Sequence, residues 1–176
     1  MALLIRNPLA TTMLVTLILT VAPWQGAQAE PGLSPQTLKE LAQVRLATAR
    51  YHNIHNAMAD GYVDANFVAP SIGCHMINFA YALDGAIDLE KPELLVYADC
   101  SGAARGRSEL RAVEYSLICP LTDCSGTPIP EGFTGDNDAW EFFEAVGNIP
   151  SQWTLHAWVW RHNPSGIFVK VNPSLD

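Results

Sequence analysis

The stretch "LLVYADCSGAARGRSELRAVEYSLIC" (Leu94 to Cys119) decides the fold. Two runs rich in aliphatic and aromatic residues, Leu94–Asp99 and Glu109–Cys119, flank a short segment rich in glycine and serine. This pattern predicts two strands of an antiparallel hairpin. Further along, the apolar run Trp153–Arg161 predicts a third strand. The turn "HNPSG" (162–166) then predicts that the chain returns as a strand through "IFVKV" (167–171).

The chain from Ser34 to Gly61 predicts one long helix. Ser34 can cap its start, Pro35 suits its first turn, and Gly61 can end it in the left-handed conformation. Between these ends, a mostly apolar stripe recurs at steps of three and four residues. Its members are Leu38, Leu41, Val44, Thr48, Tyr51, Ile54 and Met58. A long N-terminal helix followed by antiparallel strands predicts an α+β fold, in which the helix packs on one face of the sheet.

Two segments have less regular patterns. Residues 63–93 are punctuated by proline, glycine and aspartate, which predicts an ordered loop or short strands. Residues 120–150 are rich in loops, although Asp136 or Asp138 could cap a short helix. That helix would carry Trp140, Phe143 and Val146 inward. No internal repeat or interdomain linker occurs, so we expect residues 30–176 to form a single α+β domain.

Residues 1–29 have the pattern of a secretory signal peptide. Arg6 supplies the positive charge, Leu9–Ala22 form the apolar core, and Ala27-Gln28-Ala29 is a small-residue cleavage site. Glu30 is then the expected mature start. An uncleaved anchor is the alternative, but the apolar run is shorter than the roughly 20 residues that a membrane-spanning helix needs. We therefore expect a periplasmic or secreted protein with no stable membrane anchor.

The formal net charge of the sequence is −8. Nucleic acids and anionic lipids bind basic surfaces, so this acidity argues against nucleic acid as a partner. The acidity permits a metal ion or a small molecule as a partner, but a negative surface is also a general aid to solubility. Nothing in the pattern specifies an oligomer.

The four cysteines are Cys74, Cys100, Cys119 and Cys124. In an oxidising compartment an even number of cysteines indicates disulfides, and four cysteines allow three pairings. Cys119 and Cys124 lie close together in the sequence, which favours Cys119–Cys124 and leaves Cys74–Cys100. The alternative is a free Cys74 beside His75, acting as a thiolate ligand or a nucleophile.

Three polar residues stand out in and near the predicted strands. Side chains alternate across a strand, so His156 shares one face of its strand with Trp158 and Trp160. Glu114 lies in mid-strand with small neighbours on its face, and a fully buried, unpaired glutamate is rare. His75 lies in a segment that we expect to be a loop able to cross the mouth of the sheet. These three residues are the candidates for a functional site.

A metal site is the first hypothesis. If antiparallel neighbours bring Glu114 towards His156, and the loop brings His75 to both, two imidazoles and one carboxylate converge. That set suits Zn²⁺, Fe²⁺ or Cu²⁺, and an open position would hold water or a substrate. The three ligands lack tight local spacing, so a structural cluster of hydrogen-bonded residues is the alternative. We interpret His52 and His55, one helical turn apart, as solvated surface residues.

A non-enzymatic binding module is the second hypothesis. Tyr115, Trp158 and Trp160 could line a pocket for a small apolar ligand, oriented by His156 and Glu114. Aromatic residues at period two are also common in a core, and a purely structural protein is the third hypothesis. No nucleophile elbow, phosphate-binding loop or dinucleotide fingerprint occurs, so the pattern specifies no reaction.

Four segments together carry a resemblance. They are "AMADGYVDANFVAPSIGCHMIN" (57–78), "KPELLVYAD" (91–99), "RAVEYSLICP" (111–120) and "LHAWVWRHNPSGIFVKVNP" (155–173). They resemble a family of small exported bacterial proteins to which no activity is assigned. The resemblance spans about Tyr51 to Pro173 and implies export and a single domain. It implies no ligand and no catalytic residue.

Overall fold

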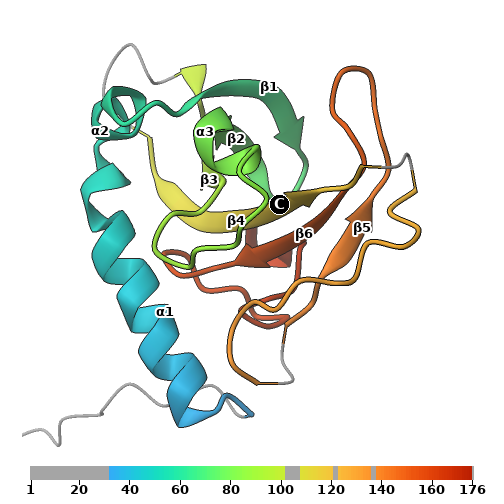
Figure 1. Ribbon diagram of the computed structural model, residues 1–176. Helices are drawn as coiled ribbons and strands as arrows, with labels where there is room; N and C mark the ends of the chain where they lie inside the picture. Colours follow the sequence, from blue (N-terminus) through green and yellow to red (C-terminus); the bar gives the residue numbers. More distant parts are fainter. Residues whose placement is uncertain (1–31, 102–107, 121–122, 136–137, 176) are drawn as a thin grey trace, which may run out of the picture.

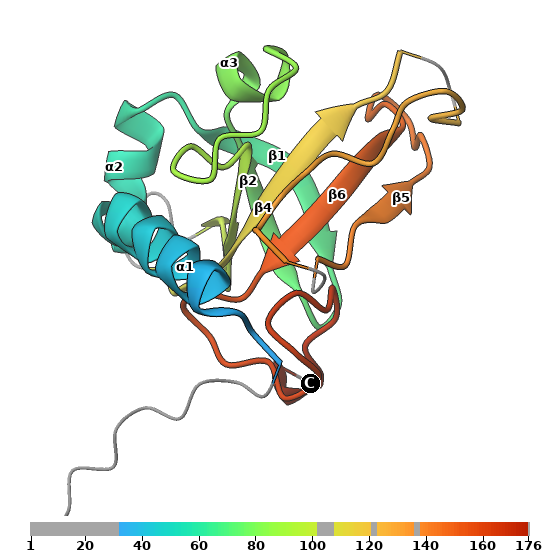
Figure 2. The ribbon, with the colours of Figure 1, turned by 60° about the horizontal axis from the view of Figure 1, so that its bottom comes forward.

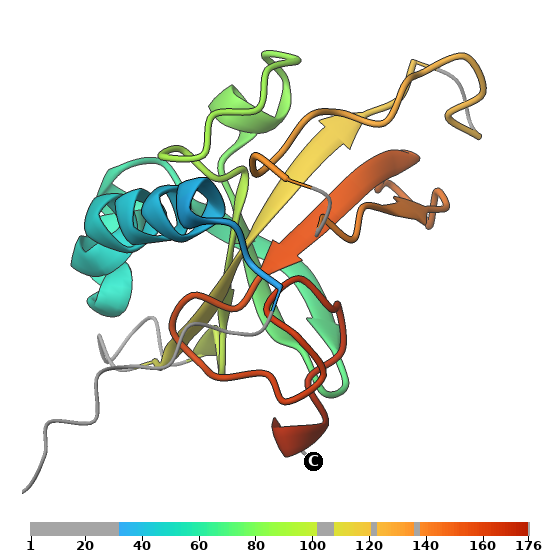
Figure 3. The same ribbon diagram turned by 90° about the horizontal axis from the view of Figure 1, so that it is seen from below.

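A computed structural model of the chain describes residues 32–101, 108–120, 123–135 and 138–175. Six antiparallel strands form one sheet in the order β1-β2-β3-β4-β6-β5. The strands are β1 (Val63–Ala69), β2 (Gly73–Ile77), β3 (Leu94–Tyr97), β4 (Leu110–Ile118), β5 (Glu141–Phe143) and β6 (Gln152–Ala157). The helices are α1 (Pro35–Thr48), η1 (Ala49–His52), α2 (Ile54–Ala59), α3 (Phe79–Ala82) and η3 (Pro173–Leu175). The α+β class is confirmed, and Figures 1 and 3 show that the sheet is strongly curled.

The helix α1 packs against one face of this sheet (Figure 2). Leu41 and Val44 of α1 belong to the same buried cluster as Val113 and Tyr115 of β4 and Leu155 of β6. Because side chains alternate along a strand, the residues between these core positions point to the opposite face. The two faces of the sheet therefore differ. One forms the core under α1, and the other carries the side chains that could form a site.

The predicted hairpin of Leu94–Asp99 and Glu109–Cys119 is confirmed as β3 paired with β4. The predicted returning strand at 167–171 is wrong, because β6 ends at Ala157 and no strand follows it among the described residues. The side-chain amide of Asn163 donates to the carbonyls of Val169 and Val171 at 2.9 and 3.0 Å. These bonds satisfy two carbonyls of the segment without a neighbouring strand.

The prediction of one long N-terminal helix is also wrong. The helical residues divide into α1, η1 and α2, and the break lies at Asn53. The backbone of Asn53 is extended, with φ −92° and ψ 104°, and its side chain accepts a hydrogen bond from the His55 amide. Asn53 thus acts as an N-cap for a new helix, which an asparagine does more readily than it continues an old one. Most of the apolar stripe is nevertheless buried, whereas Met58 is 48% exposed.

The short helix predicted between residues 120 and 150 is replaced by an edge strand. Asp136 lies outside the described residues, and the described residues from 138 to 150 contain no helix. Instead Glu141–Phe143 pair with β6, whose outer backbone groups would otherwise lack a partner strand. Phe143 is half-buried, but Val146 is 60% exposed rather than inward-facing.

The segment expected to be a loop or short strands forms β1 and β2, so His75 lies on a strand and not in a loop. The pairing of β1 with β2 contains a bulge. Asp64 lies opposite Met76 and Val68 lies opposite Cys74, so residues 65–67 of β1 stand opposite His75 alone. Asn66 adopts a positive φ of 53° within this bulge, and its amide donates to the side chain of Asp64. Bulges of this kind re-aim backbone and side-chain groups next to them.

The four cysteines form the disulfides Cys74–Cys100 and Cys119–Cys124, which is the favoured pairing. Disulfides persist in oxidising compartments, so the two bonds indicate a non-cytoplasmic protein. The free Cys74 of the alternative hypothesis does not occur. Among the described residues no helix has the length and apolar character to cross a membrane. The predicted signal peptide and its cleavage site lie outside the described residues.

Glu40 connects α1 to the loop that precedes β5. Its carboxylate accepts hydrogen bonds from the backbone amide and the hydroxyl of Thr134 at 2.7 and 2.6 Å, and from Gln36 at 2.8 Å. Burial alone would raise the pKa of Glu40, but these hydrogen bonds outweigh burial and hold the pKa below its ordinary value. The contribution of Glu40 to stability is therefore present above pH 4.5 and is lost as the pH falls through the lower pKa of the folded state.

We expect Glu40→Gln to lower the free energy of unfolding at pH 7 by about 2 kcal/mol, because charge-assisted hydrogen bonds are replaced by neutral ones. Urea denaturation at pH 7 and at pH 3 measures the effect. The difference from the wild-type protein should shrink between pH 7 and pH 3, because the pH then falls towards the lowered pKa of Glu40. The exposed Glu90→Gln is the matched control. A difference that is equal at both pH values would contradict the role of the charge.

Candidate metal centre

The side chains of His75, Glu114 and His156 converge on the face of the sheet opposite α1. Glu114 on β4 and His156 on β6 are direct partners in the antiparallel register. His75 lies on β2, which is separated from β4 by β3, and the curl of the sheet brings it to the same point. The Nε2 atoms of His75 and His156 lie 3.3 and 3.6 Å from Oε2 of Glu114. The three donor atoms all lie within 4.8 Å of one another.

All three residues are buried, with exposed fractions of 2% for His75, 6% for Glu114 and 3% for His156. Burial lowers the pKa of His75 to about 4 and holds the pKa of His156 well below its ordinary value. Burial also raises the pKa of Glu114 to about 8. The short distances would suit ion pairs, but burial keeps both imidazoles neutral and favours the protonated carboxyl at neutral pH. The cluster is therefore a set of uncharged groups with nitrogen lone pairs.

The tautomer of His75 follows from its second hydrogen bond. Its Nδ1 atom lies 3.2 Å from the carbonyl oxygen of Phe67. A carbonyl can only accept, so Nδ1 carries the hydrogen and the lone pair of Nε2 faces Glu114. The bulge in β1 makes this contact available, because Phe67 is one of the residues that stand opposite His75 without regular pairing. Metal-binding histidines commonly have their second nitrogen fixed in this way.

The Nε2 atom of His156 is buried and has no hydrogen-bond partner among the described residues. One proton on Glu114 can satisfy one nitrogen lone pair at most. Leaving a buried polar atom unpaired costs about 1–3 kcal/mol, so an unpaired atom in a native protein calls for an explanation. A cation held between the two imidazoles and the carboxylate would satisfy all three groups at once.

The cluster lies in a cavity of about 400 Å³. Most of the wall is apolar, and it is formed by all the elements that surround the open face of the sheet. The apolar lining residues are Ala65, Phe67, Ile72, Ile77, Phe79, Leu83, Leu94, Ile118, Phe143, Ile149 and Pro150. The two edge strands meet across the cavity, where the ring centroids of Phe67 on β1 and Phe143 on β5 are 5.9 Å apart. The curl of the sheet thus closes the cavity on two sides.

Lys170 is the lysine that lines this cavity. Its Nζ atom lies 3.4 Å from Oε2 of Glu141 and 5.9 Å from the centroid of the Phe143 ring. The sequence pattern misses this residue, because it belongs to the segment that we expected to be a strand. It also misses Phe67 and Phe143. The alternation of apolar and polar residues in "VDANF" (63–67) is the signal that could have placed Phe67 on a strand face.

The three predicted pocket aromatics do not line this cavity. Tyr115 alternates with Glu114 and so belongs to the core under α1. Trp158 is buried, and its indole donates to the carbonyl of Val169 at 2.7 Å. The prediction assumed that alternation continues past Ala157, but β6 ends there and the following residues no longer share the face of His156.

Trp160 lies on the α1 side of the molecule. Its indole donates to the hydroxyl of Thr48 at 3.1 Å, and its ring packs edge-on against His52 at a centroid distance of 4.3 Å. His52 and His55 are exposed, in agreement with their interpretation as surface residues. These two histidines take no part in the buried cluster.

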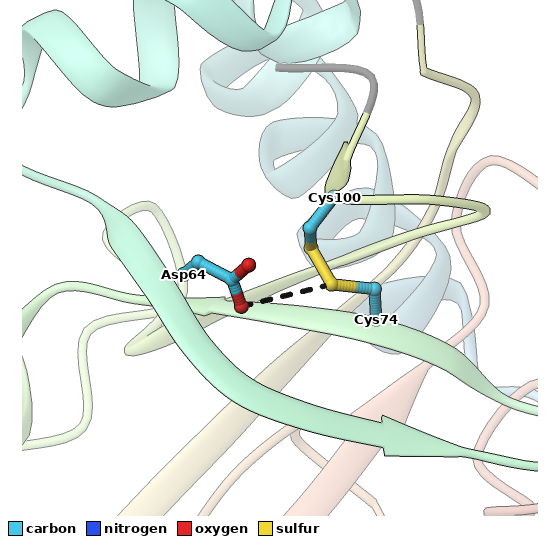
Figure 4. A group of neighbouring side chains, drawn as sticks. All are labelled: Asp64, Cys74 and Cys100. Carbon is cyan, nitrogen blue, oxygen red and sulfur yellow. Dashed lines mark hydrogen bonds between the residues drawn. A yellow bond between two sulfur atoms is a disulfide. The ribbon is translucent and has the colours of Figure 1, made fainter. Parts of the chain in front are cut away.

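A second group of potential ligands comprises Asp64 on β1, Cys74 on β2 and Cys100 in the segment after β3 (Figure 4). The Sγ atom of Cys74 is 3.9 Å from Oδ1 of Asp64. Both sulfur atoms are joined in a disulfide, so neither is available as a thiolate. The disulfide fixes β2 beside the loop that follows β3, immediately next to His75. It therefore links the strand that carries His75 to the segment that follows β3.

Comparisons of the chain with models of known protein families, with curated proteins and with solved structures gave no match. The function must follow from the geometry of the chain itself.

Proposed function

We propose that this protein is an exported domain that binds one divalent transition-metal ion through His75, Glu114 and His156. The buried and unpaired Nε2 of His156, facing the carboxylate that also faces Nε2 of His75, is the observation that carries the proposal. Zn²⁺, Fe²⁺ and Cu²⁺ are the ions that suit two imidazoles and one carboxylate.

The spacing of the donor atoms supports this assignment. Ligand atoms bound tetrahedrally at 2.0–2.1 Å from Zn²⁺ lie about 3.4 Å apart. The two histidine nitrogens lie 3.3 and 3.6 Å from the Glu114 oxygen, and all three donor atoms fall within 4.8 Å. Three atoms far apart would have needed a rearrangement of the strands to share an ion. Here only small side-chain adjustments are required.

The two imidazoles of the donor set have the neutral state that a metal site needs. Burial keeps both imidazoles neutral, and the Phe67 carbonyl fixes the hydrogen of His75 on the nitrogen that points away from the cluster. Glu114 would supply the negative charge after losing its proton to solvent. Three protein ligands leave a fourth position, which would face the cavity.

A small-molecule binding module is the second candidate function. The cavity of about 400 Å³ with a mainly apolar wall supports it. This cavity differs from the predicted one in its residues, but it contains His156 and Glu114 as the polar groups. The two functions are compatible, because a bound ion would lie at the polar end of an apolar pocket.

Titration with Zn²⁺ or Co²⁺ tests the metal site. We expect the protein, prepared without an affinity tag, to bind one ion per chain and to melt at a higher temperature. At an ion concentration of 100 times Kd the stabilisation is about 2.7 kcal/mol. Elemental analysis after gel filtration gives the stoichiometry, and thermal melts with and without a chelator give the stabilisation.

The exposed His55→Ala is the matched control and should bind the ion as the wild-type protein does. If the protein contains no stoichiometric metal and its melting temperature does not change, the proposed metal site is wrong. A rise in melting temperature that persists when His75 and His156 are both replaced would place the ion elsewhere.

A further inference from the structure

The cavity that contains the cluster has a mainly apolar lining, and His75, Glu114 and His156 lie together in its wall, which we call its polar end. Its charged and titratable lining residues, among those the structure describes, are His75, Glu114, His156 and Lys170. Asn148 and Gln152 are the uncharged polar lining residues. Pockets for small molecules typically measure about 300–1,000 Å³, so a cavity of about 400 Å³ suits a compact ligand. A ligand in this cavity would bury an apolar body and place its polar group at one end.

The polar end would carry positive charge once an ion is bound. A divalent ion with the Glu114 carboxylate leaves one net positive charge, and Lys170 adds another beside it. Lys170 lines the same cavity as the three cluster residues. Glu141 neutralises part of the lysine charge at 3.4 Å, but it is not a lining residue of the cavity.

We propose that the cavity binds a small apolar carboxylic acid as its anion, with the carboxylate at the bound ion and near Lys170 and the apolar body against the wall. This inference rests on the proposed metal site. A carboxylate suits the site better than a phosphate does. A phosphate ester carries up to two charges and needs several donors, whereas Lys170, Asn148 and Gln152 are the side-chain donors of the lining besides the histidines.

Binding of octanoate to the Co²⁺-loaded protein tests the inference. Two further compounds separate the contribution of the carboxylate from that of the apolar body. 1-Octanol has the same apolar body without the charge, and acetate has the carboxylate without the apolar body. We expect octanoate to bind at least about 10-fold more tightly than either compound. Calorimetry measures the affinities, and a shift of the cobalt absorption bands on addition of octanoate reports coordination.

Lys170→Met is the informative variant. It should weaken octanoate binding by about 10-fold, because a charge-assisted contact is lost. It should bind Co²⁺ at least as tightly as the wild-type protein, because the substitution removes a positive charge that repels the cation. The exposed Lys91→Met is the matched control and should leave both affinities unchanged.

The possible failures are distinct. If Co²⁺ does not bind, the metal site is wrong and the inference falls with it. If Co²⁺ binds but octanoate binds no more tightly than 1-octanol, the preference for an anion is wrong. If octanoate binds no more tightly than acetate, the apolar cavity is not the ligand site. Octanoate binding without any change in the cobalt spectrum would overturn the placement of the carboxylate at the ion.

Discussion

Replacing His156 with leucine is expected to weaken Zn²⁺ or Co²⁺ binding by at least about 100-fold. Loss of an outer-shell partner of a metal ligand alone costs roughly 10–100-fold in affinity, and loss of a direct ligand should exceed that. Isothermal titration of the wild-type and variant proteins measures the change. The described cluster contains only these three donors, each from a different strand. The variant therefore keeps two donors, and the cluster offers no third one to replace the missing nitrogen.

The same variant separates a metal ligand from a structural histidine. Nε2 of His156 has no hydrogen-bond partner among the described residues, so its replacement by an apolar side chain of similar size removes an unsatisfied atom. We expect the metal-free variant to be as stable as the metal-free wild-type protein, or more stable. A loss of about 1–3 kcal/mol in urea denaturation would instead identify His156 as a hydrogen-bonded structural residue. Unchanged metal affinity would exclude it as a ligand.

Removal of the Cys74–Cys100 disulfide is expected to lower the free energy of unfolding by about 3.5 kcal/mol. The two cysteines are 26 residues apart, and the chain entropy of an unfolded loop of that length gives this value. Cys119 and Cys124 are only 5 residues apart, for which the same relation gives about 2 kcal/mol. Paired replacement by alanine avoids a free thiol in either variant.

Urea denaturation of the two paired variants without reductant measures both effects. The ratio of the two losses in unfolding free energy is more informative than either loss alone. The two variants differ in loop length, whereas the replacement of cysteine by alanine is the same in both. A larger loss for the Cys119–Cys124 pair would show that native contacts, and not unfolded-chain entropy, determine the stabilisation. Metal affinity of the variant without Cys74–Cys100 would show how far that disulfide helps to place His75.

Part of the site could be predicted from the sequence because strand geometry is local. Alternation places Glu114 and His156 on one face of their own strands, and their direct pairing in the register satisfies the condition set for convergence. The hairpin of β3 and β4 follows from two apolar runs and the short segment between them. Alternation needs only the residues of one strand, and the hairpin needs only two strands adjacent in the sequence, whereas the pairing of β4 with β6 was a condition that the sequence left open.

The features of the fold and site that the sequence did not predict depend on long-range geometry. His75 reaches Glu114 across β3 because the sheet curls, and curl arises from the whole set of strands rather than from one pattern. The end of β6 at Ala157 moves Trp158 and Trp160 away from the cavity, although the apolar run itself continues. The helix breaks at Asn53 because a side-chain cap competes with a backbone bond, and helical periodicity does not detect that competition.

The bulge at Asn66 also affects how copies of the chain meet one another. An edge strand offers a row of unsatisfied backbone groups on which a second chain can add, and this is a common start of aggregation. β1 is one edge of the sheet, and its spacing is interrupted at residues 65–67. The other edge, β5, has only three residues. A regular strand could align with neither edge over more than a few residues, so the feature that turns the Phe67 carbonyl towards His75 also protects the folding chain from self-association.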